Sequence, residues 1–464
     1  MTAQINQTLI EVAYLVASAL FILALKWLSA PSTARRGVRA GEVGMVLAIG
    51  GTLLYQGIVD YTWILMALVL GSIIGVPLGL VHMTAVPQRT ALSHACGALC
   101  VSLVGTAEYY LRAPHVPPFT MAVLSMEVIL GSLTFTGSLM ATGKLQEVLP
   151  QRPITYKGQN FVNLSLLALA VIAAVILVRH PERTSLFPLL IGIPLVFGVM
   201  MIIPIGGADM PTVISLLNSY AGLSAAAMGF VLDNKMLIIA GALDGSSGFI
   251  LSVIMSKAMN RSFTNVLFGA FGQVQPSAVA GEEARTVHTA TPEEAASIMA
   301  ASNSVVIVPG YGMAVAQAQH KVKELFDALS KRGVDVKFAI HPVAGRMPGH
   351  MNVLLAEADI PYDKLMDMDA INPEFPETDV ALVIGANDVT NPAAREDKSS
   401  PIYGMPILNV DKARTVMVIK RSMSPGFAGI DNPLYYLDNT LMVFGDAKAV
   451  VGDIVRSLAG VGNA

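Results

Sequence analysis

Long apolar runs, separated by short polar stretches, fill the chain from its start to about residue 256. A membrane-spanning helix needs about 20 mostly apolar residues. Nine segments meet that length and pattern: 8–28, 43–59, 62–80, 90–111, 119–142, 160–178, 185–203, 207–231 and 235–256. The pattern predicts a polytopic α-helical membrane bundle of about nine spans. The first apolar run is too long for a signal-peptide core, so we expect it to stay as a helix.

A different pattern begins near residue 304, where short β-branched runs alternate with amphipathic segments. Strands are predicted at 304–309, 334–340, 363–368, 379–384, 415–420 and 440–444, and helices at 312–331, 348–358 and 446–459. Alternation of this kind predicts a soluble α/β, Rossmann-like domain with a parallel, doubly wound sheet. We divide the chain into a transmembrane domain (1–262), a linker without periodicity (263–295) and a nucleotide-binding domain (296–464).

Composition agrees with two environments. Of the 464 residues, 53% are hydrophobic and 14% are charged, whereas soluble domains carry about 25% charged residues. The net charge of −3 shows no basic bias, which argues against nucleic acid as a partner. Cys96 and Cys100 lie one helical turn apart in an apolar segment, so we interpret them as packing residues, and no metal-ligand spacing is present.

Basic residues in the loops indicate the topology. With nine spans and a cytoplasmic C-terminal domain, the N-terminus lies outside. The inside loops then hold Arg35, Arg36, Arg39, Arg89, Lys144, Arg152, Lys157, Lys257 and Arg261. The outside loops hold Arg112, Arg179, Arg183 and Lys235. Nine against four agrees with the positive-inside rule.

A few ionisable residues lie inside or at the ends of predicted spans: His94, Glu108, Glu127 and Asp209. Such groups are costly in lipid and usually face a bundle interior or a water-filled path. Imidazole has an unperturbed pKa near 6.5, which suits proton exchange. Asn218 and Ser138 could hydrogen-bond to His94 or to relay waters. The alternative, a structural histidine satisfied by a neighbouring hydroxyl, stays open, and Glu108 and Asp209 fit the membrane interface equally well.

The stretch Gly310-Tyr311-Gly312-x-x-Val315 follows a β-branched run and opens a predicted helix. It is a variant of the glycine fingerprint in which a dinucleotide pyrophosphate sits on the helix N-terminus. An NAD site usually has an acidic residue at the end of the second strand, but here that strand ends Ile340-His341-Pro342. Lys420-Arg421-Ser422, at a later strand end, offers two cations and a hydroxyl, which suits the 2′-phosphate of NADP. A solvated strand end is the alternative.

Further loops fall where strand ends carry ligands, at 341–350, 385–388 and 424–429. Their glycines permit close approach to a ligand. Arg346 can pair with a pyrophosphate, the last loop could close as a lid, and Asp446 is a candidate helix N-cap. No nucleophile–base constellation stands out, and hydride transfer needs none because the nicotinamide carries the chemistry.

Several of these motifs together identify a resemblance over almost the whole length. The motifs are Gly310 to Gln319, His341 to Leu355, Gly385 to Asp388, Lys420 to Ser422, Ile205 to Pro211, Leu217 to Tyr220 and Lys257 to Ser262. The chain resembles the β subunit of the proton-translocating nicotinamide nucleotide transhydrogenases, of the Si-face-to-Re-face type. The resemblance implies hydride transfer from NADH on a separate α subunit to NADP bound here. It also implies that inward proton movement drives this NADPH formation.

The resemblance also implies site residues. NADP(H) is expected to contact the residues Gly310, Tyr311, Gly312, Val315, Val343, Ala344, Gly345, Arg346, Met347, Pro348, Gly385, Ala386, Asn387, Asp388, Val389, Gly404, Met405, Lys420, Arg421, Ser422, Met423, Ser424, Pro425, Gly426, Phe427, Asp446 and Ala447. Asp388 is implied to lie near the nicotinamide and to couple nucleotide state to protonation. His94, Ser138 and Asn218 match the proton path. Phe427 stands where Tyr is common, so the lid lacks a hydroxyl.

The implied partners are one or two α-subunit chains carrying the NAD(H) domain, a dimer of the αβ assembly, and lipid of a bacterial inner membrane with the soluble domain in the cytoplasm. A rival from another class remains open. A channel or transporter gated by a regulatory NADP-binding domain would also place a Rossmann-like unit behind a helix bundle.

Overall fold

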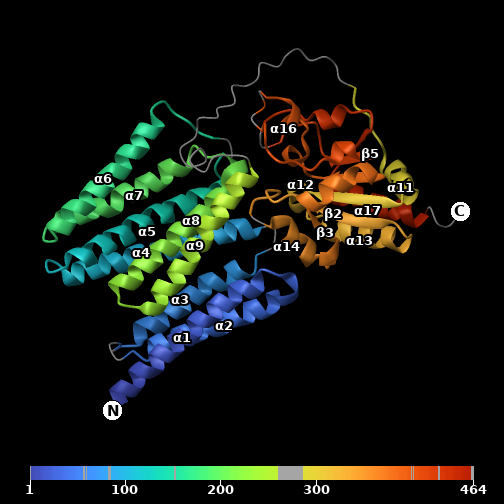
Figure 1. The fold of residues 1–464 in the computed structure, drawn as a ribbon. Coiled ribbons are helices and arrows are strands. Elements are labelled where there is room, and N and C mark those ends of the chain that lie inside the picture. The colour runs from blue at the N-terminus through green and yellow to red at the C-terminus, as the bar shows by residue number, and fades with distance from the viewer. Residues whose placement is uncertain are drawn as a thin grey trace.

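A helix bundle and a mixed sheet-and-helix domain make up the protein, and the sheet domain lies against one end of the bundle (Figure 1). The computed structural model describes residues 2–55, 58, 60–81, 85–150, 153–259, 286–347, 349–398, 400, 402–426 and 429–460. Most of the predicted linker lies outside the described residues. So do five residues named in the sequence predictions: Arg152, Arg261, Ser262, Pro348 and Phe427.

Nine long helices make up most of the bundle's described part. They are α1 Thr2–Leu28, α2 Pro31–Leu53, α3 Thr62–Gly79, α4 Val86–Arg112, α5 Pro118–Leu145, α6 Gln159–Arg179, α7 Phe187–Ile202, α8 Met210–Val231 and α9 Lys235–Ala258. Among the described residues, 8 helices are long and apolar enough to cross a membrane, and α2 is the long helix that does not qualify. The predicted membrane bundle is confirmed.

The prediction of a span over 43–59 was wrong at both ends. Helix α2 begins at Pro31, whose ring suits the first helical turn, and it ends at Leu53. It therefore contains Arg35 and Arg39, which we had placed in a loop. A prediction based on hydropathy alone does not include this charged first turn in the helix. The helix is held instead by its long contact with α1.

Helices α4, α5 and α8 pack on one another and form the centre of the bundle. Their shared apolar cluster includes Ala91, Leu133 and Leu217. Helix α9 approaches α8 especially closely because glycines line the contact. A Cβ on Gly241 would lie 2.4 Å from the backbone nitrogen of Ala226. Small residues of this kind let helix backbones meet inside a membrane.

The sheet domain holds six parallel strands in the order β3-β2-β1-β4-β5-β6. Their bounds are β1 Ser304–Pro309, β2 Asp335–Ile340, β3 Leu365–Asp367, β4 Val380–Ile384, β5 Thr415–Lys420 and β6 Thr440–Phe444. This is the Rossmann order, in which ligands bind at the carboxyl ends of the strands near the switch between β1 and β4. The α/β prediction and all six predicted strands are confirmed, since each observed strand lies within the predicted range.

Helices cover the two faces of the sheet (Figure 1). They are α11 Pro292–Ala300, α12 Tyr311–Val315, α13 Gln319–Lys331, α14 His350–Glu357, α15 Met368–Ile371, α16 Ala393–Glu396 and α17 Ala447–Gly460. Single 3-10 turns lie at Thr184–Leu186, Gly207–Asp209, Tyr362–Lys364, Asn372–Glu377, Asp388–Thr390, Val410–Lys412 and Pro433–Tyr436.

Two features of this layer differ from the sequence predictions. The single helix expected over 312–331 is broken into α12 and α13, because Gln317 adopts a left-handed conformation with φ 49°. Helix α11 begins inside the stretch assigned to the linker. Thr291 and Glu294 form a reciprocal capping box there, and Thr289 bridges to Met442 of β6. The described end of that stretch is thus part of the sheet domain.

The close α8–α9 contact predicts that Gly241→Val destabilises the bundle. The added side chain has no space against the Ala226 backbone, and overpacking typically costs about 1–3 kcal/mol. We expect a lower midpoint of thermal unfolding for the detergent-purified protein. Gly192→Val on α7 is the matched control, because nothing lies within 4 Å of its Cβ position. Equal midpoints for the two variants would contradict the assignment.

Candidate functional site

The turns after β1 and β4 touch through their backbones. A Cβ on Gly310 would lie 2.4 Å from the Ala386 Cα, and one on Gly312 would lie 2.7 Å from the Gly385 Cα. Gly385 also has a φ of +68°, a conformation that glycine adopts without strain. The glycines of the fingerprint are therefore required here for contact between two turns at the switch point of the sheet.

This contact changes the interpretation of the fingerprint. The Gly310 amide donates to the Ile384 carbonyl and the Gly312 amide to the Gly385 carbonyl, each at 2.9 Å. Helix α12 is only five residues long, and Val315 is exposed on it. The sequence prediction placed a pyrophosphate on this helix N-terminus. In the structure two of the amides that such a site would use are already bonded to β4 and its turn.

The loop after β2 is held by two buried histidines. The Nε2 of His341 lies 2.8 Å from the Pro406 carbonyl oxygen, and the Arg346 amide donates to Nδ1 of His350 at 3.0 Å. Burial lowers the pKa of His341 to about 4. Burial, together with the neighbouring Arg346 charge, lowers the pKa of His350 to about 4 as well. Both imidazoles are therefore neutral at pH 7 and act as hydrogen-bonding supports of the loop.

Arg346 connects this loop to the membrane bundle. Its side chain is 5% exposed and lies 3.2 Å from the Glu147 carboxylate. The same guanidinium donates to the carbonyl of Leu145, the last residue of α5. The Tyr311 ring covers it, with the centroid 4.2 Å away, which is within cation–π range. A cation at the C-terminus of a helix also interacts favourably with the helix dipole.

The same end of α5 holds two other helices of the bundle. Lys144 is buried, and its Nζ donates to the carbonyls of Ile203 and Ile205, at 2.6 Å each, where α7 ends. Gln88 of α4 donates to Leu145 at 3.4 Å. The sequence analysis had placed Lys144 in a loop. Its position inside α5 makes this helix end a junction of α4, α7 and the loop after β2.

Asn387 anchors the turn after β4. Its Oδ1 accepts hydrogen bonds from the Tyr435 hydroxyl at 2.7 Å and from Asn432 at 3.0 Å. The turn continues into Asp388, whose Oδ1 would lie 2.7 Å from a Cβ on Gly426. The loop after β5 therefore packs directly on the turn that the resemblance places beside the nicotinamide.

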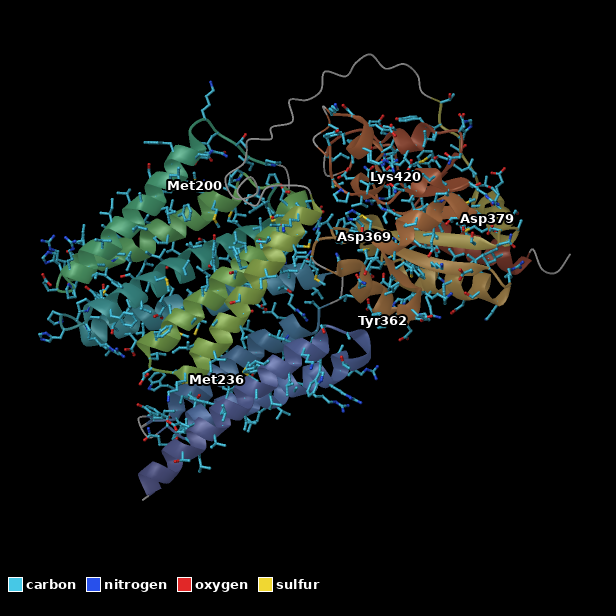
Figure 2. The ribbon with its side chains drawn as sticks, viewed as in Figure 1. Met200, Met236, Tyr362, Asp369, Asp379 and Lys420 are labelled. Atoms are coloured by element: carbon cyan, nitrogen blue, oxygen red, sulfur yellow. The ribbon has the colours of Figure 1, made fainter. Side chains whose placement is uncertain are left out.

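Lys420 ends β5 in the sheet domain (Figure 2). Its half-buried ammonium lies over the Tyr435 ring, 5.0 Å from the centroid. Its ammonium donates to the Ser424 carbonyl. Burial lowers the pKa of Lys420, while the nearby carboxylates of Asp431 and Asp388 oppose that shift. Arg421 beside it is exposed. Together they place two cations at one strand end.

Two hydroxyls and a helix cap lie beside these cations. The Ser422 and Ser424 hydroxyl oxygens are 3.0 Å apart. Asp446 accepts hydrogen bonds from the Lys448 and Ala449 amides at 3.0 and 3.2 Å, which confirms the predicted N-cap. The Gly445 amide donates to the Lys420 carbonyl at 3.0 Å, so the last two strand ends are joined.

The loops thus form a continuous strand-end rim, consisting of 310–312, 341–347, 385–389, 420–426 and 445–447. Of the predicted contacts among the described residues, all lie in this rim except Val315, Gly404 and Met405. Gly404 turns with a φ of +79° and donates to the Ala394 carbonyl at 2.8 Å. Met405 packs against the buried cluster of Ala394, Ile402 and Ile407. Which of these residues touch a nucleotide stays a prediction.

The membrane half brings two of its three predicted path residues together. His94 of α4 and Asn218 of α8 interact through their side chains, while Nδ1 of His94 is buried with no hydrogen-bond partner within the described ranges. Ser138 of α5 is buried, and its hydroxyl has no partner among the described residues. Glu127 is buried, with both carboxylate oxygens unpartnered in the described part of the chain. Glu108, by contrast, pairs with Arg112 at 2.7 Å.

Asp244 is a further ionisable residue of the membrane half that is not among the sequence predictions. This residue lies within α9, and its Oδ1 accepts a hydrogen bond from Asn218 Nδ2 at 3.0 Å. The signal was present in the sequence, because a carboxylate inside an apolar span is rare and usually functional.

Comparison with known proteins decides the family. The family model "NAD(P) transhydrogenase beta subunit" matches residues 10–457. The NAD(P) transhydrogenase subunit beta of Rhodospirillum rubrum is 50% identical over 463 residues, covering 98% of this chain and 100% of that protein. A second sequence of the same name, from a designated strain of that organism, matches equally. The chain belongs to the NAD(P) transhydrogenase beta subunit family.

Membership of the transhydrogenase beta family confirms the resemblance seen in the sequence. A transhydrogenase beta subunit is expected to bind nicotinamide nucleotides and, by its name, to have an alpha subunit as partner. The apolar helices agree with a membrane protein. The strand-end rim is then the candidate nucleotide site of this transhydrogenase subunit.

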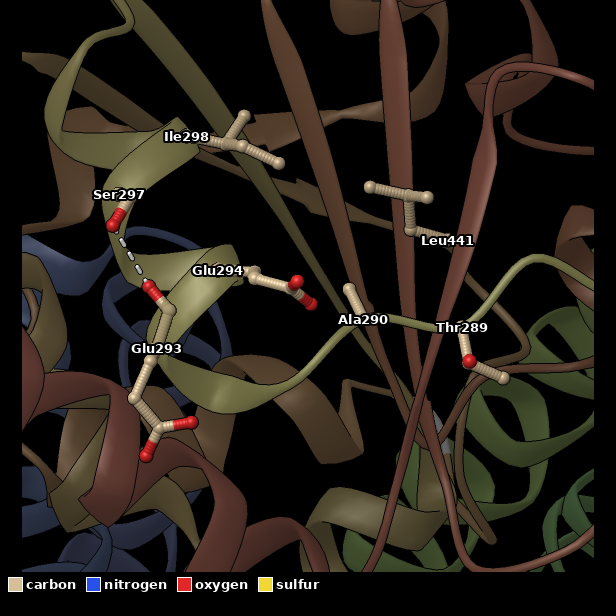
Figure 3. A pocket seen from close by; sticks show the side chains of 7 residues that line it. All are labelled: Thr289, Ala290, Glu293, Glu294, Ser297, Ile298 and Leu441. Atoms are coloured by element: carbon tan, nitrogen blue, oxygen red, sulfur yellow. Dashed lines mark hydrogen bonds between the residues drawn. The ribbon is translucent and has the colours of Figure 1, made fainter.

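A separate hollow of about 480 Å³ lies beside α11 and β6 (Figure 3). Its lining residues are Thr289, Ala290, Glu293, Glu294, Ser297, Ile298 and Leu441. None of them belongs to the strand-end rim, and the two glutamates disfavour an anionic nucleotide. The hollow is therefore not a candidate transhydrogenase site.

The contact of the two glycine turns predicts that Gly385→Ala destabilises the sheet domain and weakens NADPH binding. The methyl group would lie 2.4 Å from the Gly312 Cα. We expect about 1–3 kcal/mol from the clash, in addition to about 1–2 kcal/mol from the left-handed backbone. Gly333→Ala is the matched control, with a φ of +84° and open space at its Cβ.

The measurements are thermal unfolding and NADPH titration of the purified chain. The control should show the backbone cost alone and bind NADPH normally. If both variants lost the same stability and affinity, the close contact of the two turns would not matter.

Proposed function

We propose that the strand-end rim binds NADP(H) and that hydride passes directly between it and NAD(H) bound on the alpha subunit. This transfer would be coupled to proton movement through the helix bundle. The nucleotide supplies the hydride chemistry, and this chain binds and orients it. In the cell we expect inward proton movement to favour NADPH formation.

The residues of the rim suit NADP better than NAD. Lys420 and Arg421 place two cations at the end of β5, and the Ser422 and Ser424 hydroxyls lie beside them. Charge-assisted hydrogen bonds from such groups are the strong ones for a phosphate. The second strand ends in His341, which is neutral and already bonded, and offers no carboxylate for a ribose 2′-hydroxyl.

The observation that carries the coupling is the position of Arg346. This guanidinium belongs to a loop proposed to bind the nucleotide, yet its hydrogen bonds go to α5 and Glu147. A phosphate that attracted Arg346 would weaken its hold on α5. Binding of the nucleotide by Arg346 and binding of the α5 end by Arg346 would then compete. Such competition is a coupling free energy between two sites.

Helix α5 provides a physical route onward from this contact. It carries Ser138 and the buried Glu127, and it packs against α4 and α8, which bring His94 and Asn218 together. We propose that protonation at His94 biases the bundle between two arrangements. One would exchange NADP(H), and the other would hold it for hydride transfer. The assembly we expect is a dimer of αβ units in a bacterial inner membrane, with the sheet domain in the cytoplasm.

The test uses this chain assembled with its alpha subunit in sealed liposomes. We expect hydride transfer from NADPH to an NAD analogue, accompanied by proton movement that a pH-sensitive dye reports. His94→Ala should abolish the coupled turnover while NADPH binding is retained. Ion flux gated by NADPH without any hydride transfer would instead support a nucleotide-gated channel. Unchanged proton movement in His94→Ala would remove the role given to that residue.

The Arg346 contact predicts that Arg346→Lys uncouples the two halves. Lysine keeps the charge but loses the geometry that reaches Leu145 and Glu147 together. A hydrogen bond to a charged group contributes about 1.5–3 kcal/mol, so we expect proton movement per hydride to fall about tenfold or more. The measurement is proton movement and hydride transfer in the same liposomes.

Arg332→Lys is the matched control, because Arg332 also donates to a helix-end carbonyl, that of Leu458 in α17. It should leave the ratio of protons to hydrides unchanged. Equal ratios in the two variants would contradict a coupling role for Arg346.

A further inference from the structure

Asp244 is a carboxylate inside the membrane span of α9. It lies nine residues beyond Lys235, the start of the helix, which corresponds to about 14 Å along the axis at 1.5 Å per residue. The apolar core of a bilayer is about 30 Å thick, so Asp244 lies near its middle. A carboxylate at that depth usually faces a polar partner or a water-filled path rather than lipid.

The structure provides a polar partner. Asn218 Nδ2 donates to Asp244 Oδ1 at 3.0 Å, and the same side chain interacts with His94. Gly248 of the same helix α9 leaves room for this amide, because a Cβ there would lie 2.9 Å from Nδ2. Asn218 therefore lies between one titratable group on α4 and another on α9.

The depth of the three residues agrees with this arrangement. His94 and Asn218 each lie eight residues beyond the first residue of their helices, Val86 and Met210, or about 12 Å along the axis. Asp244 lies at the surface of the bundle in this chain, and its carboxylate bonds to Asn218 from that surface.

We propose that Asp244 is a second proton-binding group of the membrane half, linked to His94 through the Asn218 amide. Its carboxylate takes up one proton, changing from −1 to neutral, and passes the same proton past Asn218 to the His94 imidazole, which becomes a cation and then releases it. No other bond is made or broken. This inference rests on the proposed proton-coupled function and adds a residue to its path.

The test uses the αβ complex in liposomes with Asp244→Asn, which keeps an oxygen that accepts from Asn218 but cannot bind a proton. Groups that transfer protons contribute about 100-fold or more, so we expect proton movement and steady-state turnover to fall by about that factor. Single-turnover hydride transfer from bound NADPH should stay within about twofold, because it precedes proton release.

Two further variants separate a chemical role from a structural one. Asp244→Glu should restore most of the proton movement and shift the pH profile of turnover upward, because glutamate has the higher intrinsic pKa. Asp233→Asn is the matched control. It removes an exposed carboxylate just before α9 and should behave as wild type.

The outcomes are distinct. Wild-type proton movement in Asp244→Asn would overturn the inference and leave the proposed function in place. Absence of hydride transfer in the wild-type complex would overturn the proposed function itself. If Asp244→Asn fails to accumulate in the membrane, Asp244→Glu decides alone, and an unshifted pH profile then overturns the inference.

Discussion

The hydrogen bonds of the Arg346 guanidinium to the end of α5 hold the two halves of this protein in register. One cation joins the loop after β2 to the last carbonyl of a central membrane helix and to Glu147. Burial under the Tyr311 ring removes it from water, so its charge must be satisfied by these partners. Lys144, the residue before Leu145 in α5, likewise donates a hydrogen bond to a carbonyl at the end of α7. The end of α5 thus contacts α4, α7 and the loop after β2.

The strand-end rim depends on a second constraint, the close approach of two glycine turns. Gly312 and Gly385 let the ends of β1 and β4 meet, and Asn387, Tyr435 and Lys420 extend that contact to β5. Because these supports are bonded to one another, the rim is rigid at its centre. Arg421 and the Ser422 and Ser424 hydroxyls lie at its exposed edge, which is where an anionic ligand can be recognised without disturbing the sheet.

In the membrane half, polar groups are few and therefore informative. The bundle tolerates Ser138 and Glu127 in its buried interior and places Asn218 between His94 and Asp244. Each such group is unfavourable in an apolar medium unless it is paired or reached by water. They lie on α4, α5, α8 and α9, and the end of α5 contacts the loop after β2.

The sequence by itself determined that the chain has an apolar, helical half and a soluble, sheet-containing half. It also determined the six strands and the family. These features can be recognised from local sequence: the length of apolar spans, β-branched runs, and clustered motifs such as Lys420-Arg421-Ser422. It did not determine contacts between residues far apart in the chain. The break at Gln317, the burial of Lys144 inside α5, and the bonded amides of Gly310 and Gly312 all arise from packing between elements. Arg346 shows the difference most clearly. A loop arginine near a glycine fingerprint suggests a phosphate, and only the packing of the sheet domain on the bundle brings the same side chain to the end of α5.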